Sequence, residues 1–380
     1  MRIRHSCVLL LSLFPVSNAV AENLYRIGAV LPLTGDSALG GQACRNGLEL
    51  AVHDLTKAGA SPIALEVEDN AGSAPQTVTA YQKLHATSGL DAVVVWEDAA
   101  ALALAPMTER QGQVLVATSG DRAIVAGRKH AFLYWLGLDT EVERIVAESK
   151  RRGYKRLARV ITQHPGPVFM RAELDRLGSS QFTIAFDEEV PADARDFRPI
   201  LLKLKQREQV DAIVSFVWFG QIGLFAKQAR ALGITAPIIG TDAFEDENEL
   251  KSADGALEGA WFPQIADPLP EFKQKYEAAF PGASIYSAGN CHDIVMLIAE
   301  ALTRGENVSD FLNTVKDFPG ALGPVSASGD HRFVFPSIIR EVRSGKFVTA
   351  GQDEIVASER PAVAATVDIR ALPQSGGEGR

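Results

Sequence analysis

Two adjacent carboxylates stand where an apolar run of the sequence ends. The run DAVVV (91–95) has the composition of a buried strand, and WEDAA (96–100) follows it with Glu97 and Asp98. Open α/β sheets hold their ligands outside the carboxyl ends of their strands. This position predicts either acid chemistry on a ligand or a structural role, because Asp98 is also well placed to cap a helix that begins at Ala99.

Motifs of catalysis, metal binding and nucleotide binding do not occur in the chain. G-x-S-x-G, H-E-x-x-H and G-x-x-x-x-G-K-[ST] are missing, and the seven histidines lack metal-ligand spacing. The Gly-rich segment 33–47 opens a predicted helix, so its backbone N–H groups could face a polar ligand. It has neither the P-loop lysine nor the G-x-G-x-x-G spacing. We therefore expect a protein that is not an enzyme and uses no cofactor and no metal.

Strands and helices alternate along the chain in two series of similar size. The first series begins at Tyr25 and the second near Asp139, and this rhythm predicts parallel strands joined by crossover helices. Later segments return with a possible strand, a helix and a hairpin. The predicted strands of the two series are YRIGAVLP, ALEVED, DAVVVW and QVLVAT, then RLARVIT, FTIAFDEEV, AIVSFV and PIIGTD.

The first residues have the features of a secretory signal. A cationic start and a short apolar stretch precede Ala19-Val20-Ala21, which predicts a signal peptide over 1–21 with cleavage near Ala21. Cleavage leaves 36 basic residues against 47 acidic ones, a net charge of −11. Such a charge disfavours nucleic acid as a partner. We expect a soluble periplasmic protein, with a tail at 357–380 that has no regular structure.

Two cysteines remain after cleavage, Cys44 and Cys291, each near the start of a predicted helix. An oxidising compartment would allow them to pair. The sequence does not show whether their Cα atoms lie close enough for a disulfide, so two separate buried thiols are the alternative.

The opening IGAVLPLTGDSALGGQACRNGLELAV resembles that of type I periplasmic binding proteins of the branched-chain amino acid (Leu/Ile/Val) class, which serve ABC importers. Further segments that resemble this family follow in the family's order, among them EDN, APMTERQGQVLVATSG, DFRPILLKLK, IIGTDAF and FPGALGPVSASGD. The resemblance implies an α/β fold of two Rossmann-like lobes, with parallel sheets flanked by helices and joined by three crossover segments. A ligand would be held between the lobes.

On this resemblance the lobes can be assigned along the chain. We expect the first lobe to comprise 22–136 and 253–329, and the second lobe to comprise 137–252 and 330–356. Binding would be a hinge closure that buries the ligand.

The resemblance also implies a set of binding residues. In amino-acid-binding members, hydroxyl residues after the third and fourth strands hold the carboxylate of the ligand, and an acid of the second lobe pairs with its ammonium. Here the first hydroxyl position corresponds to Asp98 and the second to Asp121, with Ser119 at a backbone contact and Asp242 as the acid. The aromatic residues available as cleft walls are Trp96, Tyr134, Trp135, Trp218 and Phe219.

Asp98 and Asp121 depart from the family pattern in the same direction. An ionised carboxylate cannot donate a hydrogen bond, and like charges would repel a ligand carboxylate. The pattern disfavours leucine, isoleucine and valine, and favours an amine, an amide or a hydroxyl-rich solute. Three alternatives stay open: Asp121 pairing with Arg122 or forming an Asx turn, Arg122 turning inward to accept an anion, and the aromatic residues packing in the core.

The leading hypothesis is therefore a monomeric periplasmic receptor that delivers a small solute, such as an amino acid, amine or amide, to an ABC permease in the inner membrane. A second hypothesis is a periplasmic sensor that signals ligand occupancy to a membrane receptor, because the same fold can carry both functions. A hydrolase that uses the Asp pair is a third, weaker alternative.

Overall fold

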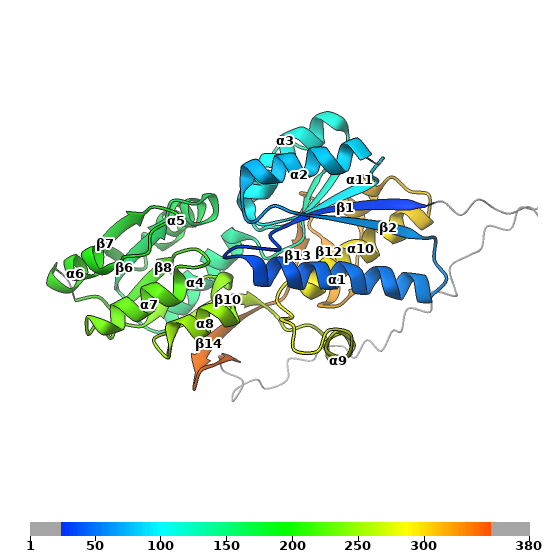
Figure 1. Cartoon of the computed structure of the whole chain (residues 1–380). Coiled ribbons are helices and arrows are strands. Elements are labelled where there is room, and N and C mark those ends of the chain that lie inside the picture. Colours follow the sequence, from blue (N-terminus) through cyan, green and yellow to red (C-terminus); the bar gives the residue numbers. More distant parts are fainter. Residues whose placement is uncertain (1–23, 88, 208, 351–380) are drawn as a thin grey trace, which may run out of the picture.

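The computed structural model describes residues 24–350 with the exception of 88 and 208. The predicted signal peptide (1–21) and the predicted tail (357–380) lie outside the described residues. Two sheets with helices packed against them form two lobes, one blue to cyan and one green in Figure 1.

The first lobe is built on a five-stranded parallel sheet with the order β2-β1-β3-β4-β5. Strands β3 and β4 are buried at every residue, as their unbroken apolar runs predict. The strands are β1 (Tyr25–Leu31), β2 (Ile63–Asp69), β3 (Ala92–Trp96), β4 (Val114–Thr118) and β5 (Ala131–Leu133). The helices are α1 (Ala38–Lys57), α2 (Ala74–Thr87), α3 (Asp98–Gln111), α9 (Pro270–Ala279), α10 (Ala288–Thr303) and α11 (Val308–Thr314), with the short 3₁₀ helix η1 (Arg122–Ile124).

The second lobe is built on a seven-stranded sheet with the order β15-β14-β10-β9-β8-β6-β7. Strands β7, β6, β8, β9 and β10 run parallel, and β14 and β15 close one edge as an antiparallel hairpin. The strands are β6 (Arg156–Thr162), β7 (Thr183–Val190), β8 (Ala212–Phe216), β9 (Ile238–Ile239), β10 (Trp261–Ile265), β14 (Ser337–Arg343) and β15 (Lys346–Thr349). The helices are α4 (Leu138–Arg151), α5 (Pro165–Gly178), α6 (Arg198–Arg207), α7 (Ile222–Ala231) and α8 (Glu247–Ala253), with the 3₁₀ helix η2 (Asp242–Phe244).

The chain passes between the lobes three times, and this agrees with the predicted α/β fold of two lobes joined by three crossovers. The passages lie between β5 and α4, between β10 and α9, and before β14. A small third sheet of β11 (Phe318–Gly320), β12 (Gly323–Ala327) and β13 (Phe333–Val334) adjoins the first lobe, where Leu133 pairs with Arg332.

Two strands depart from the expected assignment of residues to lobes. Strand β10 falls in the range 253–329 expected in the first lobe, but it pairs with β9 and β14 of the second sheet. Strand β13 falls in the range 330–356 expected in the second lobe, but it pairs with β12. Both expectations are wrong for these strands, because strand partners depend on long-range pairing that the local pattern does not contain.

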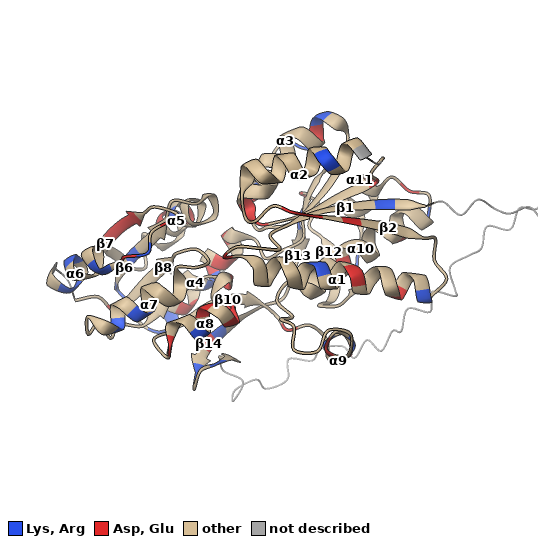
Figure 2. Cartoon of the chain, viewed as in Figure 1, with Lys and Arg blue, Asp and Glu red and all other residues tan. Residues whose placement is uncertain are grey.

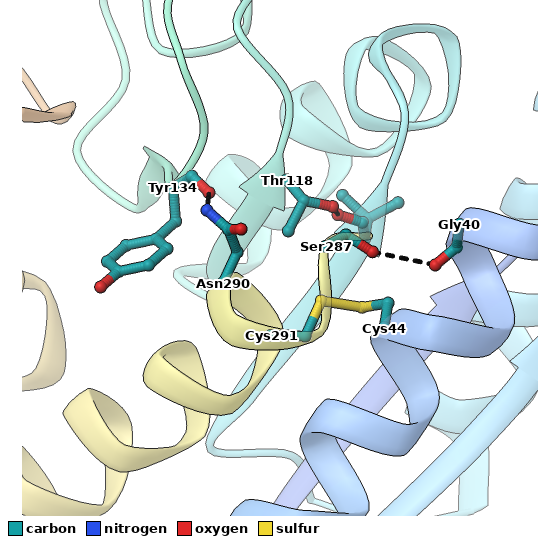
Figure 3. Close-up of a disulfide and its surroundings, with 8 residues drawn as sticks. Gly40, Cys44, Thr118, Tyr134, Ser287, Asn290 and Cys291 are labelled. Carbon is teal, nitrogen blue, oxygen red and sulfur yellow. Dashed lines mark hydrogen bonds between the residues drawn. A yellow bond between two sulfur atoms is a disulfide. The ribbon is translucent and has the colours of Figure 1, made fainter. Parts of the chain in front are cut away.

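A disulfide joins the two cysteines whose pairing the sequence left open. Cys44 of α1 and Cys291 of α10 are bonded, with their Cα atoms 5.2 Å apart (Figure 3). Gly47 lets the two helices approach closely, since a Cβ at this position would overlap the backbone of Ala288. The bond therefore ties a late segment of the chain to its first helix within one lobe.

Candidate ligand-binding site

A cleft of about 540 Å³, part of it open to solvent, lies where strands of both sheets end. Residues after β3 and β4 of the first lobe face residues after β8 and β9 and the first turn of α5 of the second lobe. This position agrees with the rule that parallel sheets hold ligands at their carboxyl ends. The cleft is lined by Trp96, Glu97, Asp98, Thr118, Ser119, Gly120, Trp135, Leu138, Gly166, Pro167, Met170, Val217, Trp218, Phe219, Thr241, Asp242, Ala243 and Tyr286.

Asp98 lines this cleft and does not act as the helix cap that the sequence also allowed. Helix α3 begins at Asp98 itself, its N-cap position is Glu97, and no side chain caps it. The buried Asp98 carboxylate instead accepts the hydroxyl hydrogen bond of Ser119. Glu97 has φ 85° and ψ 147°, a conformation that costs residues other than glycine about 1–3 kcal/mol and that recurs at ligand sites.

The surroundings of Asp98 favour its neutral form. Burial raises the pKa of Asp98 to about 7, and the nearby carboxylates of Asp121 and Asp242 add to the increase. The hydrogen bond from Ser119 and the imidazole of His164 act in the opposite direction without reversing the shift. A cation bound beside Asp98 would lower this pKa again and favour the ionised carboxylate.

Asp242 provides a second carboxylate from the other lobe. It begins η2, and its carboxylate accepts a hydrogen bond from the indole N–H of Trp135. Burial raises the pKa of Asp242 to about 6, although the bond from Trp135 opposes this. The backbone N–H of Asp242 donates to Glu141 Oε2 at 3.1 Å. Glu141 is fully buried, and its Oε1 has no hydrogen-bond partner among the described residues. Burial and the charge of Asp242 hold the pKa of Glu141 well above its ordinary value.

Polar contacts hold the two lobes together around the cleft. His164 of the second lobe lies 3.3 Å from Glu97 of the first (Nε2 to Oε1) and stacks on Trp218, with ring centroids 4.0 Å apart. Arg122 reaches across to Glu173 at 2.9 Å (Nη2 to Oε1). Together with the pair of Asp36 and Arg195, at 2.7 Å between Oδ2 and Nη2, these contacts show that the lobes are closed on one another.

Aromatic rings form much of the remaining wall. Trp96 lies 5.8 Å from Phe219 across the cleft, measured between ring centroids, and Trp135 lies 5.5 Å from Tyr286. Gly40 makes room for the Trp96 ring, which a Cβ at this position would overlap. Stacked and edge-to-face rings around buried carboxylates can hold a cation or an aromatic body.

Five of the seven predicted site residues line the cleft, and two do not. The lining ones are Trp96, Asp98, Ser119, Trp218 and Asp242. Their contact with a ligand stays a prediction.

Tyr134 was wrongly predicted to line the cleft. Its ring is fully buried against Phe333 and Phe335, and its hydroxyl donates to Asp293 Oδ2 at 3.2 Å. Successive residues of extended backbone point to opposite sides, so Tyr134 enters the core while its neighbour Trp135 enters the cleft.

Asp121 also lies outside the cleft lining. Its carboxylate accepts from the backbone N–H of Ala123 at 2.9 Å and caps η1, so the Asx-turn alternative is confirmed. Arg122 binds Glu173 and does not turn into the cleft. Among the described residues that line the cleft there is no lysine or arginine.

The sequence did not indicate Tyr286 or Thr241 as cleft residues, nor His164 as the residue that contacts Glu97 of the first lobe. Thr241 lies within the segment IIGTDAF, beside the predicted Asp242. Tyr286 and His164 belong to no motif, and Tyr286 reaches the cleft just before α10 on a returning segment. Trp135, one of the aromatic residues that the sequence makes available as cleft walls, does line the cleft.

Three further features describe the residues beyond the cleft. Within residues 24–350, apart from the two gaps, no group of three or more His, Cys, Asp or Glu side chains is arranged to hold a metal ion. No helix in the same residues is long and apolar enough to cross a membrane. Lys and Arg are interspersed with Asp and Glu over both lobes in Figure 2.

Comparison with known proteins gives the family. The sequence profile described as periplasmic binding protein matches residues 25–346. The chain belongs to the periplasmic binding protein family. Relatives of this binding protein are solute-binding proteins rather than enzymes, and its two-lobed architecture is that of the type I fold.

Three relatives of this periplasmic binding protein illustrate the similarity. It is 23% identical over 320 residues to the Leu/Ile/Val-binding protein BraC3 of Rhizobium johnstonii, covering 79% of this chain and 86% of that protein. The leucine-binding protein LivK of Thermotoga maritima superposes with a TM-score of 0.79 at 18% identity, covering 86% and 97% of the two chains. The branched-chain amino acid transporter substrate-binding protein LivJ of Streptococcus pneumoniae, in complex with isoleucine, gives 0.76 at 22% identity, covering 86% and 100%.

Proposed function

We propose that this periplasmic binding protein captures a small cationic amine with an apolar or aromatic body and delivers it to an ABC importer. Capture is by closure of the two lobes over the cleft, and no bond is made or broken. The charge of the lining residues supports this ligand class. Glu97, Asp98 and Asp242 are acidic, and among the described lining residues no lysine or arginine balances them.

The single observation that carries the proposal is the hydrogen bond from Ser119 to Asp98. A ligand carboxylate needs donors, and this hydroxyl group is already used by a side chain of the protein. The hydroxyl of Thr118, which also lines the cleft, is directed to the carbonyl of Val95 at 3.4 Å. Both hydroxyl groups are therefore already directed to acceptors of the protein itself.

The charge interaction with an ionised carboxylate of the cleft favours a cation over an anion. A ligand carboxylate about 4 Å from one ionised carboxylate of the cleft is destabilised by about 4 kcal/mol at an effective dielectric constant of about 20, and an ammonium at the same place gains a similar amount. Each aromatic face in contact with the cation adds about 0.5–2 kcal/mol. Trp96, Trp135 and Trp218 provide such faces.

The importer as partner and the periplasm as location are supported by the family and by the predicted signal peptide at 1–21. The solved relative LivJ is described as the substrate-binding protein of a transporter. A permease in the inner membrane would receive the closed, loaded protein, which we propose acts as a monomer. The negative net charge of the sequence disfavours nucleic acid as a partner.

Three ligands that share one branched carbon skeleton test the proposal. Isoamylamine has the ammonium of leucine without its carboxylate, 4-methylpentanoate has the carboxylate without the ammonium, and leucine has both. We expect isoamylamine to raise the melting temperature and the acid to leave it unchanged, because only the amine complements Asp98 and Asp242. Isothermal titration calorimetry then gives each Kd.

The variant Asp98→Ser provides the matched control. It restores a hydroxyl at this position and frees the hydroxyl of Ser119, so we expect weaker binding of isoamylamine and a gain of leucine binding. Tight binding of leucine or of 4-methylpentanoate by the unmodified protein, without binding of the amine, would refute the proposed ligand class and leave the fold intact.

A further inference from the structure

Glu141 is a fully buried carboxyl group in the first turn of α4, directly after the first crossover between the lobes. It does not line the cleft. Burial of a polar group costs free energy unless hydrogen bonds offset the loss of water. Oε2 of Glu141 accepts the backbone N–H of Asp242 at 3.1 Å, and Oε1 has no hydrogen-bond partner among the described residues. The contact with Asp242 therefore connects this buried group to the cleft, which Asp242 lines.

Asp242 is held through its backbone N–H, its backbone carbonyl and its carboxylate. The N–H donates to Glu141, the carbonyl oxygen accepts from Nε2 of Gln264 at 3.2 Å, and the carboxylate accepts from the indole N–H of Trp135. Trp135 and Glu141 lie on the two sides of the first crossover, and Gln264 lies in β10. Because residues on both sides of the crossover hold Asp242, the direction of its carboxylate depends on both of them.

The surroundings of Glu141 make it a neutral acceptor. Burial and the charge of Asp242, with a smaller part from Asp98, hold the pKa of Glu141 well above its ordinary value, although the hydrogen bond from the backbone opposes this. Burial and the charges of Asp242 and Glu141 likewise raise the pKa of Tyr286, whose ring lines the cleft. A neutral acid can carry its proton on Oε1 and still accept at Oε2. Glu141 can therefore hold Asp242 without placing a further negative charge behind the cleft.

We propose that Glu141 is a positioning residue for amine binding, which fixes the turn η2 by accepting the backbone N–H of Asp242 so that the carboxylate of Asp242 faces the ligand. It acts through Asp242 and does not contact the ligand itself, since it lies outside the cleft lining. The inference rests on the proposed function and adds to it a buried residue beside a crossover on which the affinity depends. Without this acceptor the N–H of Asp242 loses its partner, and the turn is free to shift.

Substitutions of Glu141 separate the acceptor from the bulk of the side chain. Glu141→Gln keeps a neutral carbonyl oxygen that can accept the N–H, so we expect a Kd for isoamylamine within about twofold of that of the unmodified protein. Glu141→Met removes the acceptor and leaves an apolar side chain of similar length, and titration calorimetry should show binding at least about tenfold weaker. Glu141→Leu removes the same acceptor with a different shape and should give the same loss, so the test does not depend on how one apolar side chain packs.

Two measurements distinguish positioning from a general effect on folding. In a double-mutant cycle with Asp242→Asn, Glu141→Met should cause little further loss of affinity, because Glu141 acts through the carboxylate of Asp242. The second measurement is the pH dependence of the Kd. Burial raises the pKa of Asp242 to about 6, so this group contributes to the pH dependence of amine binding. Glu141→Met should remove that contribution and retain the one from Asp98, whereas Glu141→Gln should retain both.

The controls are Glu143→Met on the exposed face of α4 and Glu271→Gln on the exposed side of α9, which should change neither the affinity nor its pH dependence. An unchanged Kd in Glu141→Met would overturn the positioning role. So would an equal loss in Glu141→Gln and Glu141→Met, or a full further loss when Glu141→Met is added to Asp242→Asn.

The outcomes also separate the two proposals. In each case that overturns the positioning role, the unmodified protein still binds isoamylamine, and the proposed function stands. Failure of the unmodified protein to bind any amine would overturn the proposed function, and the positioning role with it.

Discussion

Amine binding should strengthen steeply as the pH rises, because the carboxyl groups of the cleft are largely protonated at low pH. In the unliganded protein the pKa of Asp98 is raised to about 7 and that of Asp242 to about 6, in both cases mainly by burial. A bound ammonium favours the ionised form and lowers both pKa values. Binding is then accompanied by release of protons in the pH range between the lowered and the raised pKa values.

The size of this change in affinity with pH follows from the two pKa values. Near pH 5 about 99% of Asp98 is protonated in the free protein, and near pH 8 only about 10%, so this group alone changes the affinity about 100-fold, or about 2.7 kcal/mol. Asp242 contributes a further factor of about ten. An alkyl ammonium keeps its own charge over this range, as a lysine side chain does.

Titration calorimetry of isoamylamine at several pH values measures this directly. Pairs of buffers with different ionisation enthalpies give the number of protons released. Asp98→Asn should leave only the roughly tenfold dependence due to Asp242, while Glu271→Gln should retain the full dependence. A Kd independent of pH would refute the reasoning. Tighter binding of isoamylamine at low pH would also refute it, because the ionised form of Asp98 would then not be the form that binds the amine.

Three further predictions concern lobe closure, stability and the edge of the site. Gly166→Ala should weaken isoamylamine binding at least about tenfold by calorimetry, because a Cβ would overlap Asp98 Oδ2 in the closed form, while the melting temperature of the free protein stays nearly constant. Gly89→Ala, with open space around it, is the control, and equal affinities would contradict the closed geometry. Reduction of the Cys44–Cys291 disulfide, which closes a loop across a sequence separation of 247, should lower the melting temperature, with a chain-entropy limit of about 5 kcal/mol; an unchanged value would mean the bond does not form. Tyr134→Phe should leave the Kd unchanged within about twofold, because its hydroxyl contacts Asp293; a tenfold loss would return Tyr134 to the site.

Local patterns were sufficient for most of the first lobe and for Glu97 and Asp98, whereas Asp242 was indicated only by the resemblance to the family. The unbroken apolar run before WEDAA predicts strand β3, and residues at the end of a parallel strand must lie at the ligand edge of the sheet. Local patterns do not show which distant segments pair in a sheet or meet at the cleft. Strand β10 was assigned to the wrong lobe, and nothing around Tyr286 indicates that the returning segment brings it into the cleft.

The sequence by itself determined the chemistry available to this protein: carboxylates at strand ends, aromatic residues beside them, and two cysteines able to pair. Only the tertiary structure decided how that chemistry is used. Asp98 has a raised pKa because closure buries it near Asp242 of the other lobe, and a local pattern contains neither the burial nor the neighbour. Trp135 faces the cleft while Tyr134 joins the core, because the direction of a side chain is set by the backbone path at the crossover.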